Sequence, residues 1–210
     1  FSMNKIEQQI KVAISSDSDV ITCKWGLFDN MKVEFCEDLK AYKDYTNPFN
    51  FFNDLYADKG YFLSHAYLVN HTLLQSKNMS WDEDLRINQD AVFFSNVLIC
   101  SNLISFSCEC YCLYRKSNQS SVSKRGSQFI FQYVNSIKKI ENLLTINFSK
   151  VPSNFKTYKY NSYLRVRSFL KNTKITNLGF SVLYYYRIEI LKHKIQYIIS
   201  MIKKKFLYKN

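Results

Sequence analysis

Glycine and proline are scarce in this sequence. Only 4 Gly and 2 Pro occur among 210 residues, which excludes collagen-like repeats, flexible low-complexity linkers and most turn-dense β-sandwiches. Apolar residues make up 47% of the chain, too large a share for a wholly disordered protein. The length allows one domain of ordinary size, or one domain followed by a tail.

Acidic residues are nearly absent from the last part of the chain. Residues 1–122 hold 11 Lys and Arg against 15 Asp and Glu, a net charge of −4. Residues 123–210 hold 18 Lys and Arg against 2 Asp and Glu, a net charge of +16. The basic character therefore belongs to one end of the chain, and this end is expected to meet an anionic partner.

Histidine is also scarce, and the 6 cysteines include no CxxC pair. With 3 His, four convergent ligands for a zinc ion are not expected. Cys108, Cys110 and Cys112 alternate, so on a strand they would share one face as small buried thiols. Free thiols and a first segment without a secretory signal pattern indicate the cytosol. The longest uncharged run, 91–108, is interrupted by Ser and Asn and predicts a buried helix and a strand, not a membrane span.

Hydrophobic periodicity along the chain predicts both helices and strands. The expected helices are 4–15, 48–57, 67–75, 90–100, 127–145, 164–171 and 180–207. The expected strands are 20–25, 31–36, 61–64, 103–106 and 110–114. The expected connections include an acidic loop at 78–89, a Ser-rich loop at 118–126 and a linker at 152–163.

The most informative segment spans residues 61–124. It contains, in order, Trp81-Asp82-Glu83-Asp84-Leu85, Gln89-Asp90, Phe93-Phe94, Ile104-Ser105-Phe106, Tyr114-Arg115 and a Ser-rich loop. This order and spacing resemble the acceptor-side half of the family 2 glycosyltransferases, which are inverting enzymes with a GT-A nucleotide-sugar fold. Each motif alone is weak, and the ordered set carries the resemblance.

The helix and strand before this segment extend the resemblance to residues 1–145. Asn4-Lys5-Ile6-Glu7-Gln8-Gln9 and Asp19-Val20-Ile21 are similar to the family's helix and strand that follow its metal-binding Asp-x-Asp. The resemblance implies a partial GT-A α/β fold, a mixed sheet with flanking helices, without the family's N-terminal nucleotide-binding half. The implied divisions are an acceptor-side half at 1–125, a packing helix at 126–150 and a basic helical tail at 151–210.

Asp90 is the candidate for the catalytic base. Inverting glycosyl transfer needs a group that removes the proton of the attacking hydroxyl. By sequence Asp90 opens a helix, where the dipole and the free N–H groups keep a carboxylate ionised. From this position alone a helix cap is the simpler explanation, and it is the resemblance that favours the base. Gln89 departs from the acid that the family commonly has before its base, and the resemblance implies that it binds substrate.

Four other residues are candidates for substrate contacts. Trp81 has an aromatic face that can stack on a sugar ring or pack in the core. Glu83 belongs to an acidic run of which one or two side chains can face the cleft, and a solvated loop is the simpler explanation of this run. Arg115 can bind a phosphate or an acidic sugar, or form a structural ion pair. His65 follows the short strand where the family places pocket residues, although a packed core histidine is the simpler explanation.

Asp17-Ser18-Asp19 has the form of the family's metal-binding motif. In that family the motif ends an apolar strand, where its carboxylates reach a divalent ion at the nucleotide phosphates. Here it follows a helix and precedes its strand, so a solvated turn is the favoured interpretation. The resemblance implies a divalent cofactor, Mn²⁺ or Mg²⁺, for the complete enzyme, with its Asp-x-Asp ligands not identified in this chain.

An apolar stripe is predicted near the C-terminus. It is formed at spacings of three or four by Ile188, Leu191, Ile195, Ile198, Ile202 and Phe206. Lys and Arg flank both edges of the stripe, an arrangement that suits binding of residues 180–207 to an anionic membrane surface. A helix docked on its own domain is the structural alternative. Nucleic-acid binding would fit the charge, but no motif supports it.

Together these features predict transfer of a sugar from a nucleotide-sugar donor to a saccharide or lipid-linked acceptor, with inversion, in cell-surface polysaccharide synthesis. The family and the basic tail imply a peripheral location on the cytoplasmic face of the cell membrane. Two alternatives stay open at this point. One is a non-catalytic remnant of such an enzyme, and the other is a basic nucleic-acid-binding module.

Overall fold

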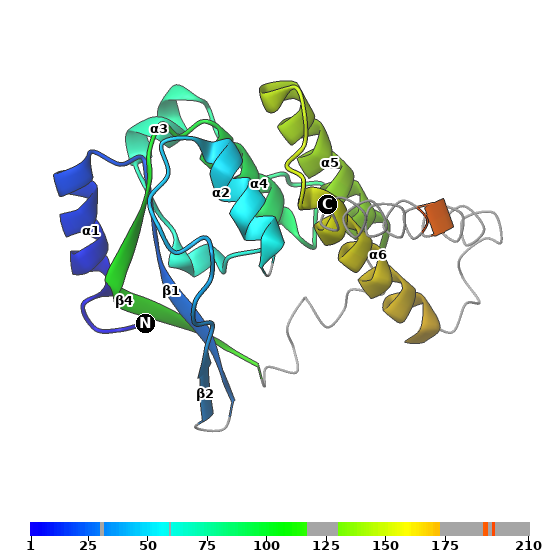
Figure 1. The fold of residues 1–210 in the computed structure, drawn as a ribbon, viewed down its shortest axis with the longest axis horizontal. Coiled ribbons are helices and arrows are strands. Elements are labelled where there is room, and N and C mark those ends of the chain that lie inside the picture. Colours follow the sequence, from blue (N-terminus) through cyan, green and yellow to red (C-terminus); the bar gives the residue numbers. More distant parts are fainter. Residues whose placement is uncertain (30–31, 59, 117–129, 173–190, 193–194, 196–210) are drawn as a thin grey trace, which may run out of the picture.

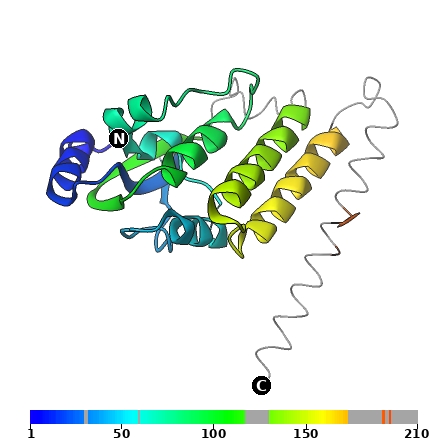
Figure 2. The same cartoon turned by 90° about the horizontal axis from the view of Figure 1, so that it is seen from above.

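A computed structural model describes residues 1–29, 32–58, 60–116, 130–172, 191–192 and 195. Within these residues a mixed sheet of four strands lies between one helix on one side and two layers of helices on the other (Figures 1 and 2). The predicted α/β fold, a mixed sheet with flanking helices, is confirmed. No helix in this described part is long and apolar enough to cross a membrane.

The sheet is built around β1 (Val20–Asp29). β2 (Lys32–Phe35) and β3 (Leu68–Val69) pair with β1 in antiparallel orientation, and β4 (Ile104–Arg115) pairs with it in parallel. The two strands predicted at 103–106 and 110–114 are therefore one strand, interrupted by a bulge. Lys24 pairs with Tyr111, whereas the residue before it pairs with Ser107.

The bulge in β4 changes the surroundings of the alternating cysteines. Cys110 and Cys112 are buried, whereas Cys108 is exposed. The expectation that all three share one face is wrong, because inserted residues break the alternation of a strand. The thiols of Cys23 and Cys112 are hydrogen-bonded, and this bond together with burial raises the pKa of Cys23. A thiol in such surroundings is a packing group and a poor nucleophile.

Helix α1 (Lys5–Ser16) contacts β4 and confirms the predicted N-terminal helix. Its inward side is polar, with Lys5 and Gln9 buried. The Gln9 amide donates to two backbone carbonyls from other elements at 2.9 and 3.2 Å. The three isoleucines of the helix face solvent instead, with Ile6, Ile10 and Ile14 exposed by 54%, 44% and 79%.

The other side of the sheet is covered by α2 (Pro48–Ala57) and α4 (Gln89–Ile99). α5 (Ile130–Phe148) packs against α4, and α6 (Phe155–Asn172) packs against both α2 and α5. Figure 2 shows α4, α5 and α6 side by side. The short elements η1 (Ser64–Ala66) and α3 (His71–Ser76) connect α2 to the rest of the chain.

Three local predictions are wrong. The strand expected at 61–64 is absent, and η1 and β3 occupy this region. The helix expected at 67–75 begins only at His71. Most of the linker expected at 152–163 belongs to α6. Phe155 and Tyr163 of this helix are buried in the hydrophobic core. Tertiary packing stabilises this helix where the local sequence gave little signal.

Some predictions fall on residues outside the described part of the chain. They are the Ser-rich loop, the division at 125/126 and nearly all of the predicted helix at 180–207. These stay predictions.

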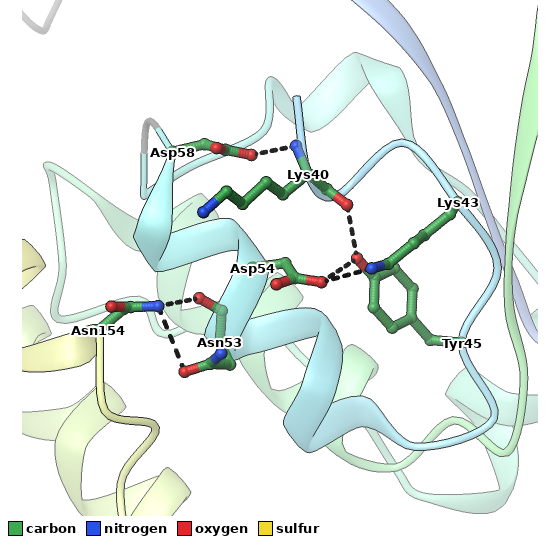
Figure 3. A network of polar contacts seen from close by, with 7 residues as sticks. All are labelled: Lys40, Lys43, Tyr45, Asn53, Asp54, Asp58 and Asn154. Carbon is green, nitrogen blue, oxygen red and sulfur yellow. Dashed lines mark hydrogen bonds and ion pairs between the residues drawn. The ribbon is translucent and has the colours of Figure 1, made fainter. Parts of the chain in front are cut away.

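Polar contacts hold two segments to α2, residues 40–45 and the start of α6 (Figure 3). The Tyr45 hydroxyl lies 2.9 Å from Asp54 Oδ2 and 3.0 Å from the carbonyl oxygen of Lys40. On the other side of the helix, the Asn154 amide donates to the carbonyl of Asn53 at 3.0 Å. α6 therefore begins at a fixed point on α2, and both helices contribute to the wall of one cavity.

Candidate functional site

A cavity of about 620 Å³ is lined by residues of η1, α2, α4 and α6 and by the end of β4. Much of its wall is aromatic, and it includes Tyr56, Tyr61, Tyr67, Phe94, Tyr114 and Tyr158. Charged and polar groups share the wall at His65, Asp90, Lys116 and Arg165. A cavity of this size with few convergent polar groups is typical of a small-molecule site.

Asp90 lies in the first turn of α4 and lines the cavity. The N-cap position belongs to Asn88, whose side-chain amide donates to the Ser136 hydroxyl at 2.8 Å. The Asp90 carboxylate accepts the N–H of Ala91 at 3.0 Å. Burial raises the pKa of the Tyr67 phenol, and the nearby negative charge of Asp90 raises it further. The structure thus places an acid beside an aromatic wall, and the catalytic role of Asp90 stays a prediction.

His65, the second predicted residue on this cavity, is partly buried. One face of its ring lies near Tyr114, at 6.4 Å between centroids, and Phe1 contacts it edge-on at 5.6 Å. Burial lowers the pKa of the imidazole, the charge of Lys5 lowers it further, and a hydrogen bond to the backbone of Leu113 opposes both. Its Nε2 is buried with no hydrogen-bond partner among the described residues. A neutral His65 therefore carries one ring nitrogen that no described residue binds.

Trp81 does not line the cavity. Its indole stacks on Phe93 with centroids 4.2 Å apart, meets Phe94 edge-on at 6.2 Å, and is 45% exposed. Asp82, in the same loop, forms an ion pair with Lys139 of α5. The acidic loop is thus held to the helices by aromatic and ionic contacts, so that it is a structural element beside the cavity.

Three further predicted residues also lie outside the cavity. Glu83 and Gln89 are exposed, and neither lines it. The Arg115 guanidinium is exposed and lies 5.1 Å above the ring of Phe28, in a cation–π contact. It is the next residue, Lys116, that reaches the cavity wall.

Sequence reasoning missed the contribution of α6. Tyr158, Ser162 and Arg165 line the cavity, although they were expected in a linker and a tail. Burial raises the pKa of Tyr158, whose phenol is hydrogen-bonded by the side chains of Asn88 and Ser162. The signal that could have found these residues is their spacing of four and three, which puts them on one side of a helix.

The structure places Asp17-Ser18-Asp19 in the turn between α1 and β1, although this turn is only partly solvated. Asp17 ends α1 in the left-handed conformation with φ of 54°, and Ser18 is buried with its hydroxyl 2.6 Å from that of Ser105. Asp19 accepts the N–H of Asn102 at 2.6 Å. Across the described residues no group of three His, Cys, Asp or Glu side chains could hold a metal ion. These residues do not fit the divalent ion that the resemblance implies, and no chemical step is derived through it.

The fold resembles that of residues 1–349 of S. aureus TarS. The solved structure of residues 1–349 of S. aureus TarS matches this chain with a TM-score of 0.50 at 15% identity, over 92% of this chain and 51% of TarS 1–349. TarS 1–349 in complex with UDP-GlcNAc gives a TM-score of 0.45 at 14% identity, over 90% and 61% of the two chains. Its complex with UDP gives 0.43 at 15% identity, over 90% and 59%.

At this identity the likeness concerns the fold alone. The chain spans about half the length of TarS 1–349. No protein-family model and no curated protein matches the sequence.

Proposed function

We propose that this chain provides the acceptor-binding part of a glycosyl-transfer site. The observation that carries the proposal is that Asp90 and His65 lie on one aromatic cavity in a fold that resembles a glycosyltransferase. Aromatic side chains offer faces on which sugar rings stack, and a carboxylate and a neutral imidazole nitrogen accept hydrogen bonds from hydroxyl groups. A saccharide, free or lipid-linked, is therefore the proposed ligand.

The proposed reaction is a single displacement with inversion. The Asp90 carboxylate takes the proton of the acceptor hydroxyl as its oxygen bonds to the anomeric carbon of the donor sugar, and the bond from that carbon to the nucleotide diphosphate breaks. His65 would hold a second hydroxyl of the acceptor through its spare nitrogen and orient the attacking oxygen. The setting we propose is the synthesis of a cell-surface polysaccharide.

A nucleotide-sugar is the proposed donor. TarS has been solved with UDP-GlcNAc and with UDP, and the family resemblance of the sequence implies the same class of donor. Because the chain spans about half of TarS 1–349, we assign the donor site, with its Mn²⁺ or Mg²⁺, to a part of such enzymes that this chain does not match. This chain alone should then bind nucleotide-sugars weakly or not at all.

Two binding measurements and one assay test the proposal. In calorimetry, the chain should bind acceptor oligosaccharides and show little binding of UDP-GlcNAc with Mn²⁺. Transfer of labelled sugar should be seen when a donor-binding polypeptide of this fold is joined to the chain. Absence of saccharide binding contradicts the proposal, and binding without transfer in the joined protein favours a non-catalytic remnant. Micromolar binding of UDP-GlcNAc that disappears in Asp17→Ala would place the metal site in this chain.

We also propose that the chain associates with the cytoplasmic face of the membrane through residues 180–207. The support is the predicted apolar stripe with its basic edges, of which Leu191 and Ile195 are 57% and 50% exposed. Each Lys or Arg near an anionic leaflet adds about 1 kcal/mol. Sedimentation with phosphatidylglycerol vesicles should show binding that weakens at high salt and when Ile195 and Ile198 are changed to Ser. Unchanged binding after deletion of residues 180–210, or preference for oligonucleotides over vesicles, contradicts it.

A further inference from the structure

Two cationic side chains share one part of the cavity wall. Lys116 follows the last residue of β4 and Arg165 belongs to α6, and both line the cavity with Tyr61. Burial raises the pKa of the Tyr61 phenol, and the positive charges of Arg165 and Lys116 oppose this effect. Both cations therefore lie near the same phenol, although 49 positions separate them along the chain.

The two cations differ in what already binds them. The Lys116 ammonium forms an ion pair with Glu34 at 2.5 Å, and the same carboxylate lies 3.4 Å from Lys32. Arg165 is exposed and forms no ion pair with any carboxylate of the described residues. Its guanidinium offers five N–H donors in a planar fork, which makes it the available anion-binding group of this wall.

The position of Arg165 is set by the packing of α6. Tyr158 and Ser162 precede it on the same side of the helix, and the Tyr158 phenol is hydrogen-bonded to Asn88, directly before α4. Val166, the next residue, is fully buried. The backbone that carries the guanidinium is thus fixed to the element that carries Asp90.

We infer that Arg165, assisted by Lys116, binds an anionic oxygen group of the acceptor, a phosphate or a carboxylate. The inference rests on the proposed function and deepens it, because it makes the acceptor a phosphorylated or acidic saccharide. A planar guanidinium matches the oxygens of either group in a bidentate way. The anion belongs on the Arg165 wall because the Asp90 carboxylate would repel it. The other carboxylate that lines the cavity, Asp58, accepts the backbone N–H of Lys40.

The diphosphate of a nucleotide is a second source of the same chemistry, and the experiment separates the two. The chain of 210 residues is titrated in calorimetry at low salt with glucose, glucose 6-phosphate and UDP. We expect glucose 6-phosphate to bind about tenfold more tightly than glucose. Arg165→Gln should remove this preference, whereas Arg165→Lys, which keeps the charge and loses the fork, should keep part of it.

Arg86→Gln is the matched control, because Arg86 is an exposed arginine outside the cavity. It should leave the preference unchanged, and circular dichroism should show that all the variants fold. Equal binding of glucose and glucose 6-phosphate by the unaltered chain overturns the inference and leaves the proposed function intact. If Arg165→Gln loses more affinity for UDP than for glucose 6-phosphate, Arg165 binds the donor, and the inference is also overturned. If neither sugar binds, the proposed function itself fails.

Discussion

The residues that carried the family resemblance divide into two groups with different surroundings. Asp90 and His65 line an aromatic cavity, whereas Trp81 stacks on α4 at the surface and Arg115 lies over a phenylalanine ring. Even neighbours differ, because Gln89 is exposed and outside the cavity while Asp90 lines it. Consecutive residues of a helix point about 100° apart, so a motif read along the chain cannot place all of its side chains in one site.

The largest expected difference between the two groups concerns Asp90. In the protein joined to a donor-binding part, Asp90→Asn should lower the turnover of sugar transfer by about 10²-fold or more, because an amide cannot accept the proton of the attacking hydroxyl. Binding of the nucleotide-sugar should be unchanged, since the variant keeps the shape of the side chain. Release of UDP and calorimetry measure the two quantities.

Asp84→Asn is the control for this variant. Asp84 is an exposed acid of the loop outside the cavity. The turnover of Asp84→Asn should therefore stay close to that of the unaltered protein. A turnover near normal in Asp90→Asn, or an equal loss in both variants, contradicts the assignment of the base.

The fold was predictable where local periodicity and tertiary packing agree. The helices α1, α2 and α4 lie close to their predicted bounds, and the central strand β1 begins where predicted but continues to Asp29. The orientation of α1 could not be predicted, because Gln9 turns inward to donate to carbonyl groups that distant segments supply, and the buried Lys5 ammonium in turn donates to Gln9. An apolar stripe predicts a helix, and only the three-dimensional structure shows which side is buried.

Only part of the candidate site, Asp90 and His65, was predictable from the sequence. Asp90 was proposed from its place at the start of a helix together with the family resemblance, and both are read from the sequence near it. Tyr158 and Arg165 were missed because α6 reaches the cavity through its packing on α2 and α5, far along the chain from Asp90. Trp81 could equally have stacked on a sugar or packed on the protein, and its ring partner is Phe93.

A smaller effect is expected for His65. His65→Gln should weaken binding of an acceptor oligosaccharide by about fivefold at pH 7.5, the loss of one hydrogen bond. Because burial lowers the pKa of His65, the imidazole is neutral at this pH. Its protonation as pH falls would remove the acceptor nitrogen, so the unaltered chain should bind less tightly at acidic pH. Titration at several pH values measures this.

The charged groups around His65 determine how the pH effect is read. Lys5 and the N-terminus both act on the imidazole, and Asp90 lines the same cavity. The pH effect that is specific to His65 is therefore the difference in oligosaccharide affinity between the unaltered chain and His65→Gln. This difference should vanish at low pH. His71→Gln, at an exposed histidine of α3, should behave as the unaltered chain. If the affinity of His71→Gln falls as much as that of His65→Gln, or if His65→Gln binds normally, the proposed role of His65 is wrong.

The smallest effect on binding is expected for Trp81. Trp81→Ala removes the stack on Phe93, and aromatic pairs of this kind contribute about 1 kcal/mol beyond the area that they bury. The free energy of unfolding should fall by about this amount, which lowers the Tm by about 2–4 °C in a domain of this size. Binding of the oligosaccharide should change by less than about twofold, because Trp81 does not line the cavity. Trp81→Phe keeps an aromatic ring for Phe93 and should recover most of the stability in a thermal melt. A loss of oligosaccharide affinity as large as that of His65→Gln, without a change in Tm, would instead place Trp81 in the acceptor site and remove the distinction between the two groups of residues.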